Sequence, residues 1–166
     1  MHSMMNRQPV RRGAVAAALL AVVFAWPAVA ADLSPPPKAA DKLAAARTQI
    51  AAKNFAGAID ELKKINDTAS ADWNNLIGYS LRKNTPPDVA GAEKFYDDAL
   101  RLDPKHRGAL EYSGELYLMT DRLDKAEERL ATLDKVCTLP CEEYSALKKS
   151  VARYKANGNK FVAGNW

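Results

Sequence analysis

The chain contains two cysteines, Cys137 and Cys141, and their type and spacing indicate chemistry more directly than any other residues do. Three residues separate them, and one of these is Pro140. The spacing differs from the Cys-x-x-Cys of thiol oxidoreductases, and two thiolates are too few for a zinc site, which usually takes about four ligands. In an oxidising compartment, an intrachain disulfide is the leading interpretation. Free thiols and a redox or metal-binding role are the alternatives.

Other signatures of catalysis are absent from the sequence. It has no phosphate-binding glycine loop, dinucleotide fingerprint, nucleophile elbow or paired-histidine metal helix. After residue 30 the single histidine is His106, which follows Asp103-Pro104-Lys105 and is expected to be a solvated residue at the start of a helix. We therefore expect no enzyme activity, no metal and no cofactor.

The first 30 residues have the three parts of a secretory signal peptide. Residues 1–12 contain three arginines and no acidic residue, and residues 14–26 form an uninterrupted apolar run. That run is shorter than the roughly 20 residues of a membrane-spanning helix. It is followed by Ala28-Val29-Ala30, a small-x-small site of the type that signal peptidase cleaves. We expect a mature chain that begins at Ala31, is exported to the periplasm and has no stable membrane insertion.

The positive charge of the chain lies mainly in this leader. The 166 residues carry 24 basic and 20 acidic side chains, which gives a formal net charge of +4. Removal of residues 1–30 takes away three arginines and no acidic residue, so 21 basic and 20 acidic side chains remain, a net charge of +1. No zinc-finger spacing, aromatic RNA-binding motif or continuous basic stripe is present, and nucleic-acid binding is not expected.

The rest of the chain is patterned for helices. After a proline-rich linker at residues 31–38, apolar residues recur at helical spacing and strand-like alternation is absent. Small residues recur twelve positions apart, as in Ala46 and Ala58 or Gly114 and Ala126. Small side chains with this spacing allow two antiparallel helices to cross closely. The sequence therefore predicts an all-α chain of helix-turn-helix units.

These units resemble the tetratricopeptide repeat, a helix-turn-helix of about 34 residues. The clearest match begins at residues 73–79, with the sequence WNNLIGY, and closes at residues 102–104, with the sequence LDP. Its inner turn, residues 84–88, is two residues longer than usual, so that Ala92 rather than Ala90 falls in register.

The resemblance covers roughly residues 39–136 and implies a short right-handed α-solenoid of about three antiparallel helix pairs. Pro140 precedes a further helical segment, which is expected to cap the stack. The predicted domain therefore spans residues 39–156, and residues 157–166 are expected to form a flexible tail.

In the tetratricopeptide family, the first helix of each pair lines a concave groove that receives partner peptides. The resemblance places eight residues on or near this groove: Arg47, Asn75, Tyr79, Arg82, Lys83, Glu111, Glu115 and Met119. Arg82 and Lys83 are expected to hold a carboxylate of the partner, while Asn75 pairs with its backbone. Tyr79 is expected to provide a flat apolar contact. The carboxylate clamp of the family is not preserved, because its positions are filled by Leu43, Leu76, Gly108 and Tyr112.

We therefore expect a non-catalytic adaptor or scaffold that binds a protein or peptide partner in the bacterial cell envelope. Two other functions stay open at this point. One is a thiol-redox or metal-binding module that uses Cys137 and Cys141, and the other is a structural subunit that assembles through its convex face.

Overall fold

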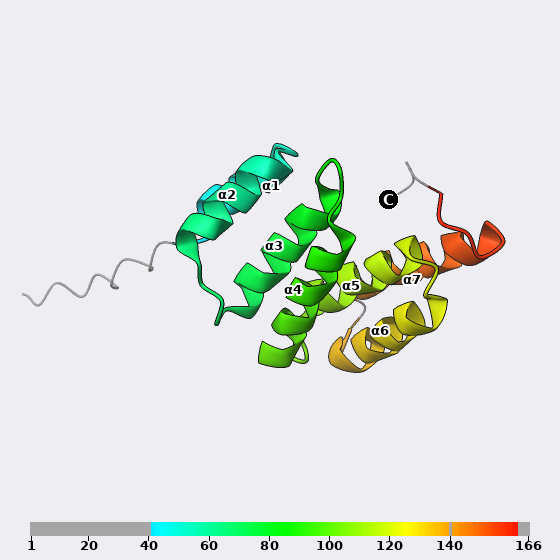
Figure 1. The fold of residues 1–166 in the computed structure, drawn as a ribbon. Coiled ribbons are helices and arrows are strands. Elements are labelled where there is room, and N and C mark those ends of the chain that lie inside the picture. Colours follow the sequence, from blue (N-terminus) through cyan, green and yellow to red (C-terminus); the bar gives the residue numbers. More distant parts are fainter. Residues whose placement is uncertain (1–40, 140, 163–166) are drawn as a thin grey trace, which may run out of the picture. The chain divides into compact units, whose positions relative to one another are not determined.

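The structure is a computed structural model that describes residues 41–139 and 141–162. Within these residues it contains seven α-helices and no strand (Figure 1). The expected signal peptide, residues 1–30, and linker, residues 31–38, lie outside the described residues. The helices are α1 (Ala44–Ala51), α2 (Phe55–Ile65), α3 (Ala71–Lys83), α4 (Val89–Leu102), α5 (Arg107–Met119), α6 (Leu123–Val136) and α7 (Glu142–Ala156).

Six of the helices form three successive pairs, α1 with α2, α3 with α4 and α5 with α6 (Figure 1). Each pair packs against the next one through its neighbouring helices, α2 on α3 and α4 on α5. The first helices of the pairs also contact one another, because α3 touches both α1 and α5. The last helix, α7, packs on both α5 and α6. This arrangement confirms the predicted all-α helical-repeat solenoid with a C-terminal capping helix.

Side-chain caps start four of the helices. Asn54 Oδ1 accepts a hydrogen bond from the Gly57 amide at 3.1 Å, and Asp88 Oδ1 accepts one from the Gly91 amide at 2.8 Å. The Ser70 hydroxyl and a ring nitrogen of His106 cap α3 and α5 in the same way. Because each cap satisfies an amide that the first helical turn leaves free, these residues fix where the helices begin.

Small residues allow close packing between helices, although not always between the helices that the spacing suggests. A Cβ atom at Gly78 would lie 2.9 Å from the Tyr96 ring and 3.2 Å from the carbonyl oxygen of Ala92, so α3 approaches α4 closely here. Ala92 is fully buried and Ala90 is exposed, which confirms the predicted register. At Gly114, in contrast, the nearest atoms belong to Leu147 of α7, at 2.6 Å. This glycine therefore makes room for the capping helix.

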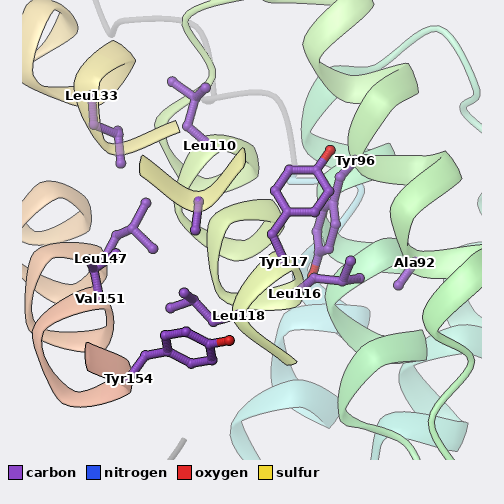
Figure 2. Packing of buried hydrophobic residues seen from close by; sticks show 11 residues of the cluster. Ala92, Tyr96, Leu110, Leu116, Tyr117, Leu118, Leu133, Leu147, Val151 and Tyr154 are labelled. Atoms are coloured by element: carbon purple, nitrogen blue, oxygen red, sulfur yellow. The ribbon is translucent and has the colours of Figure 1, made fainter. Parts of the chain in front are cut away.

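The apolar residues gather in two clusters. The smaller one joins α1, α2 and α3 and comprises Leu43, Ala46, Leu62, Trp73, Leu76 and Ile77. The larger one is formed by residues of the four helices α4, α5, α6 and α7. Figure 2 shows Leu110 and Leu118 of α5 together with Leu133 of α6 and Leu147 of α7. Phe161, in the segment predicted to be a flexible tail, packs against the larger cluster. Residues 163–166 of that segment lie outside the described residues.

The junction between α6 and α7 contains both cysteines. Cys137 follows α6, Cys141 precedes α7, and a disulfide joins them across a Cα–Cα distance of 5.8 Å. No group of three or more histidine, cysteine, aspartate or glutamate side chains that could hold a metal ion is found within the described part of the chain. Among the same residues, none of the helices has the length and apolar character needed to cross a membrane.

Candidate protein-binding surface

The residues expected to meet a partner come mainly from α3 and α5, which lie in contact. On α3 the spacing of Asn75, Tyr79 and Arg82 by four and three residues places them on one side of the helix. On α5 the same rule groups Glu111, Tyr112, Glu115 and Met119. We call these seven residues, together with Lys83, the α3–α5 surface.

Within this surface, an ion pair between Arg82 and Glu115 connects α3 with α5. Arg82 Nη2 lies 2.8 Å from Glu115 Oε2, and the Arg82 side chain is only 1% exposed. The other carboxylate oxygen, Glu115 Oε1, accepts a hydrogen bond of 3.2 Å from the hydroxyl of Ser150 in α7. Arg82 Nη1 lies 3.8 Å from the sulfur of Met119. Arg82, Glu115 and Met119, which are three of the eight expected contact residues, therefore form a largely buried network. Through Ser150 this network also reaches the capping helix α7.

This network changes the role expected for Arg82. Burial lowers the pKa of Arg82, but the adjacent Tyr96 and Glu115 outweigh this effect and raise the pKa above its ordinary value, so the guanidinium stays charged. Its charge is neutralised inside the protein by Glu115. The structure thus gives Arg82 a structural role in place of the expected contact with a partner's carboxylate. A buried guanidinium needs such a partner, since an uncompensated charge in the interior is costly.

Aromatic rings form the more exposed part of the surface. The ring centroids of Tyr79 and Tyr112 lie 4.6 Å apart, and the Phe55 ring meets Tyr79 edge-on at 6.0 Å. The Arg82 guanidinium carbon lies 5.6 Å from the centre of the Tyr79 ring and 5.8 Å from that of Tyr112. Both tyrosines are half-buried. Rings held in this way contact a partner with little further loss of conformational freedom.

Tyr112 and Phe55 were not among the expected contact residues. Tyr112 lies one residue after Glu111 on α5 and occupies one of the positions at which the sequence departs from the carboxylate clamp, and only the structure brings its ring against Tyr79. Phe55 is the first residue of α2, and the spacing within one helix does not reveal that it reaches the ring of Tyr79.

Glu111 is the acidic residue of the surface that the buried network does not use. Burial raises its pKa to about 8, and repulsion from Glu115 and Glu143 adds to this effect. Nearby, burial and the negative charge of Glu111 raise the pKa of Tyr112 to about 12. The carboxyl group of Glu111 is therefore held in surroundings that disfavour its negative charge.

The remaining expected contact residues are Asn75, Lys83 and Arg47. Asn75 is 7% exposed, and Lys83 is half-buried at the C-terminal end of α3. Burial, helped by the charge of Arg82, lowers the pKa of Lys83. Arg47 on α1 is exposed and lies 3.3 Å from Asp41 and 3.7 Å from Asp72. The structure thus brings the α3 and α5 residues together and leaves Arg47 in contact with acidic residues at the start of α1 and α3.

His106 links the starts of two helices. Its Nδ1 accepts the Ala109 amide at 3.0 Å, and its Nε2 lies 3.0 Å from Asp72 Oδ1 on α3. Because Nδ1 acts as the acceptor, we assign the proton to Nε2, which donates to Asp72. The His106 side chain is 13% exposed, and so it is a helix cap between two repeats rather than the solvated residue that was expected.

The fold and this surface define a helical-repeat protein whose successive helix pairs place their first helices side by side. Comparison with known families identifies the repeats. Residues 88–150 match the model of the tetratricopeptide repeat, a segment that extends from the start of α4 into α7. This match supports the tetratricopeptide repeat assignment that the sequence resemblance indicated. Members of this family are in general non-enzymatic scaffolds that bind other proteins. No curated protein matches the chain.

Proposed function

We propose that this protein is an exported adaptor of the bacterial cell envelope that binds a protein or peptide partner through the α3–α5 surface. The observation that carries the proposal is the pair of half-buried rings, Tyr79 and Tyr112, centred 4.6 Å apart on adjacent helices. Tyrosine is enriched where protein partners bind, because it supplies a large contact area and a polar tip at a low entropic cost. Binding by such a surface makes and breaks no covalent bond.

The packing of the helices supports recognition by a surface that is formed before the partner arrives. Tyr79 is held by Phe55 on one side and Tyr112 on the other, while Arg82 and Glu115 fix the distance between α3 and α5. A partner that docks on preorganised side chains loses less free energy to ordering them.

The proposed location depends on the first 30 residues. Their arginines, apolar run and Ala28-Val29-Ala30 site are the features that a secretory signal peptide requires. An exported protein also meets the oxidising conditions in which a bond between Cys137 and Cys141 persists. Intact-mass measurement of the protein from cell fractions tests this directly. We expect a mature chain that begins at Ala31 in the periplasmic fraction, and a mass that begins at Met1 would contradict export.

The binding surface is tested by photocrosslinking in living cells. The photoreactive residue p-benzoylphenylalanine is placed at Tyr79, at Tyr112 and, as a control, at the exposed Glu128 of α6. We expect a discrete crosslinked partner from the first two positions and none from the third. The partner should also be lost when Tyr79→Ala is combined with Tyr112→Ala. Capture from position 128 alone would move the binding surface to the second helices of the repeats.

A further inference from the structure

Around Glu111, acidic side chains outnumber basic ones on and beside the α3–α5 surface. Arg82, its most buried cation, is neutralised by Glu115. Among the described residues no hydrogen bond or ion pair is made by the carboxyl group of Glu111. One half-buried acidic group therefore stays without a cation in this part of the surface.

The charges around Glu111 come from three helices. Glu115 lies one turn further along α5, and Glu142 and Glu143 approach from α7. The facing cation on α3 is Arg82, whose charge is already shared with Glu115. On α5 itself, Arg107 lies 3.6 Å from Glu143 rather than against Glu111. The sum is negative, and it adds to the effect of burial, which is the main cause of the raised pKa of Glu111.

Asn75 provides a second and independent observation that points to a ligand. This side chain is 7% exposed, and among the described residues its Oδ1 has no hydrogen-bond partner. Its amide is directed at Gly108 of α5, where a Cβ atom would lie only 3.0 Å from Nδ2. Gly108 precedes Glu111 and Tyr112 by about one turn, so the unsatisfied amide oxygen and the carboxyl group belong to the same stretch of the surface.

Asn75 Oδ1 and the ionised carboxylate of Glu111 are both hydrogen-bond acceptors without a donor among the described residues. A buried acceptor left without a donor is destabilising, and a ligand that supplies N–H groups recovers that cost. The two tyrosine rings beside Glu111 already accommodate one cation, since the Arg82 guanidinium carbon lies 5.6 and 5.8 Å from their centres. Acceptors next to aromatic faces are the combination that binds ammonium and guanidinium groups.

We propose that the stretch formed by Asn75, Glu111 and Tyr112 binds a basic side chain, lysine or arginine, of the partner. This inference rests on the proposed function and specifies the chemistry of the partner. It reverses the polarity expected from the sequence, where Arg82 and Lys83 were assigned to a carboxylate of the partner. The absence of a side chain at Gly108 lets the Asn75 amide approach α5 closely. Glu111 supplies the opposite charge once it has lost its proton.

Binding of a cation at Glu111 is coupled to a proton. The free carboxyl group has a pKa of about 8, and it must lose its proton to pair with the cation. Affinity for a basic peptide should therefore rise by about tenfold per pH unit below pH 8 and level off above it. A lysine side chain keeps its charge throughout this range, because its ordinary pKa is about 10.4.

The experiment uses the mature protein and three fluorescein-labelled peptides of equal length. Their sequences alternate alanine with lysine, with glutamine or with glutamate, and both ends are blocked. Dissociation constants are measured by fluorescence anisotropy for the wild type, for Glu111→Gln and for the matched control Glu128→Gln on the exposed side of α6. Circular dichroism verifies that each variant is folded.

We expect the lysine peptide to bind at least about tenfold more tightly than the glutamine peptide, with the glutamate peptide weakest. Glu111→Gln should remove this preference and the pH dependence, while Glu128→Gln should leave both unchanged. Equal binding of the three peptides, or an unchanged preference in Glu111→Gln, would overturn the assignment of a basic side chain.

Failure of this inference can be told apart from failure of the proposed function. If all peptides bind alike and Tyr79→Ala with Tyr112→Ala abolishes that binding, the surface is correct and the preference for a cation is wrong. If no peptide binds, the cation site is also overturned. The crosslinking at positions 79 and 112 then decides separately whether the surface receives a protein.

Discussion

Arg82 Nη2 lies 2.8 Å from Glu115 Oε2, and this contact joins α3 of the second repeat to α5 of the third. The guanidinium is 1% exposed and the carboxylate is 14% exposed. Residues that would otherwise display opposite charges to a partner are thus used to hold two repeats together. The half-buried side chains that this pair leaves to a partner include Tyr79, Tyr112, Glu111 and Lys83.

Replacement of Arg82 by methionine is expected to destabilise the protein by about 3–5 kcal/mol, because it leaves Glu115 as a buried charge without its partner. Urea unfolding followed by circular dichroism measures this loss. The double variant Arg82→Met with Glu115→Gln should be more stable than Arg82→Met alone, since it removes the uncompensated charge. Lys94→Met, which breaks an exposed pair with Asp98, serves as the control and should cost about 0.5 kcal/mol or less. A similar loss in both methionine variants would contradict the buried role of Arg82.

The arrangement of the helices could be predicted because it depends on local features of the sequence. The glycine at position 78 and the alanine at position 92 meet where α3 and α4 pack closely, as the two-residue expansion of the inner turn indicated. The longer turn at residues 84–88 lies between the end of α3 at Lys83 and the start of α4 at Val89. Turns, small residues and prolines act within one helix pair, and so a single repeat carries the information.

The pairing of side chains between repeats could not be predicted in the same way. Arg122 reaches the carboxylate of Glu93 with both Nη atoms, at 2.7 and 2.8 Å, across 29 positions of the sequence. Arg82 and Glu115 are 33 positions apart. The helical pattern shows which side of a helix these residues occupy, but the partner of each charge depends on how neighbouring pairs stack. For this reason the sequence indicates which residues of α3 and α5 share one side of a helix, while the roles of Arg82 and Tyr112 depend on the contacts between repeats.

His106→Ala is expected to destabilise the protein by about 1 kcal/mol, because it removes the ring nitrogen that caps α5. His106→Asn should recover most of this loss, since asparagine is among the best helix caps, although it gives up the contact of Nε2 with Asp72. Thermal unfolding of the three proteins at neutral pH distinguishes them. If alanine and asparagine are equally destabilising, the contact with Asp72 rather than the cap is the important one.

Removal of the disulfide should loosen the capping helix. The bond between Cys137 and Cys141 closes a loop of five residues, for which loop entropy indicates a stabilisation of about 2 kcal/mol. The double variant Cys137→Ser with Cys141→Ser is therefore expected to unfold at a lower urea concentration. Amide hydrogen exchange should increase in α7 more than in α3, because α7 follows the bond directly. Uniform faster exchange in all helices would show that the disulfide stabilises the whole stack instead of its end.

Gly114→Ala should also act through α7. An added Cβ atom would lie 2.6 Å from a methyl carbon of Leu147, a fully buried residue of the capping helix. Overpacking of this kind costs about 1–3 kcal/mol, which exceeds the gain of about 1 kcal/mol in helix propensity. Combining the substitution with Leu147→Ala should reduce the loss due to Gly114→Ala, and a double-mutant cycle of urea unfolding measures that coupling. Independent effects of the two substitutions would argue against the contact between α5 and α7.

The stability of the protein is expected to fall as pH rises, because of Glu111. Its pKa is about 8 in the folded chain and about 4.5 when the chain is unfolded. Between these two pH values Glu111 holds a proton in the folded chain that it has released in the unfolded chain. The contribution of Glu111 to the free energy of unfolding is therefore complete below pH 4.5 and is lost as pH increases to about 8. Since solvent screens a group that is partly exposed, we expect a loss of only about 1 kcal/mol. Urea unfolding at acid and alkaline pH should show this slope in the wild type and in Glu128→Gln, while Glu111→Gln should flatten it. An equal slope in all three proteins would mean that Glu111 ionises freely in the folded state, and it would remove the pH dependence inferred for the binding of a basic partner.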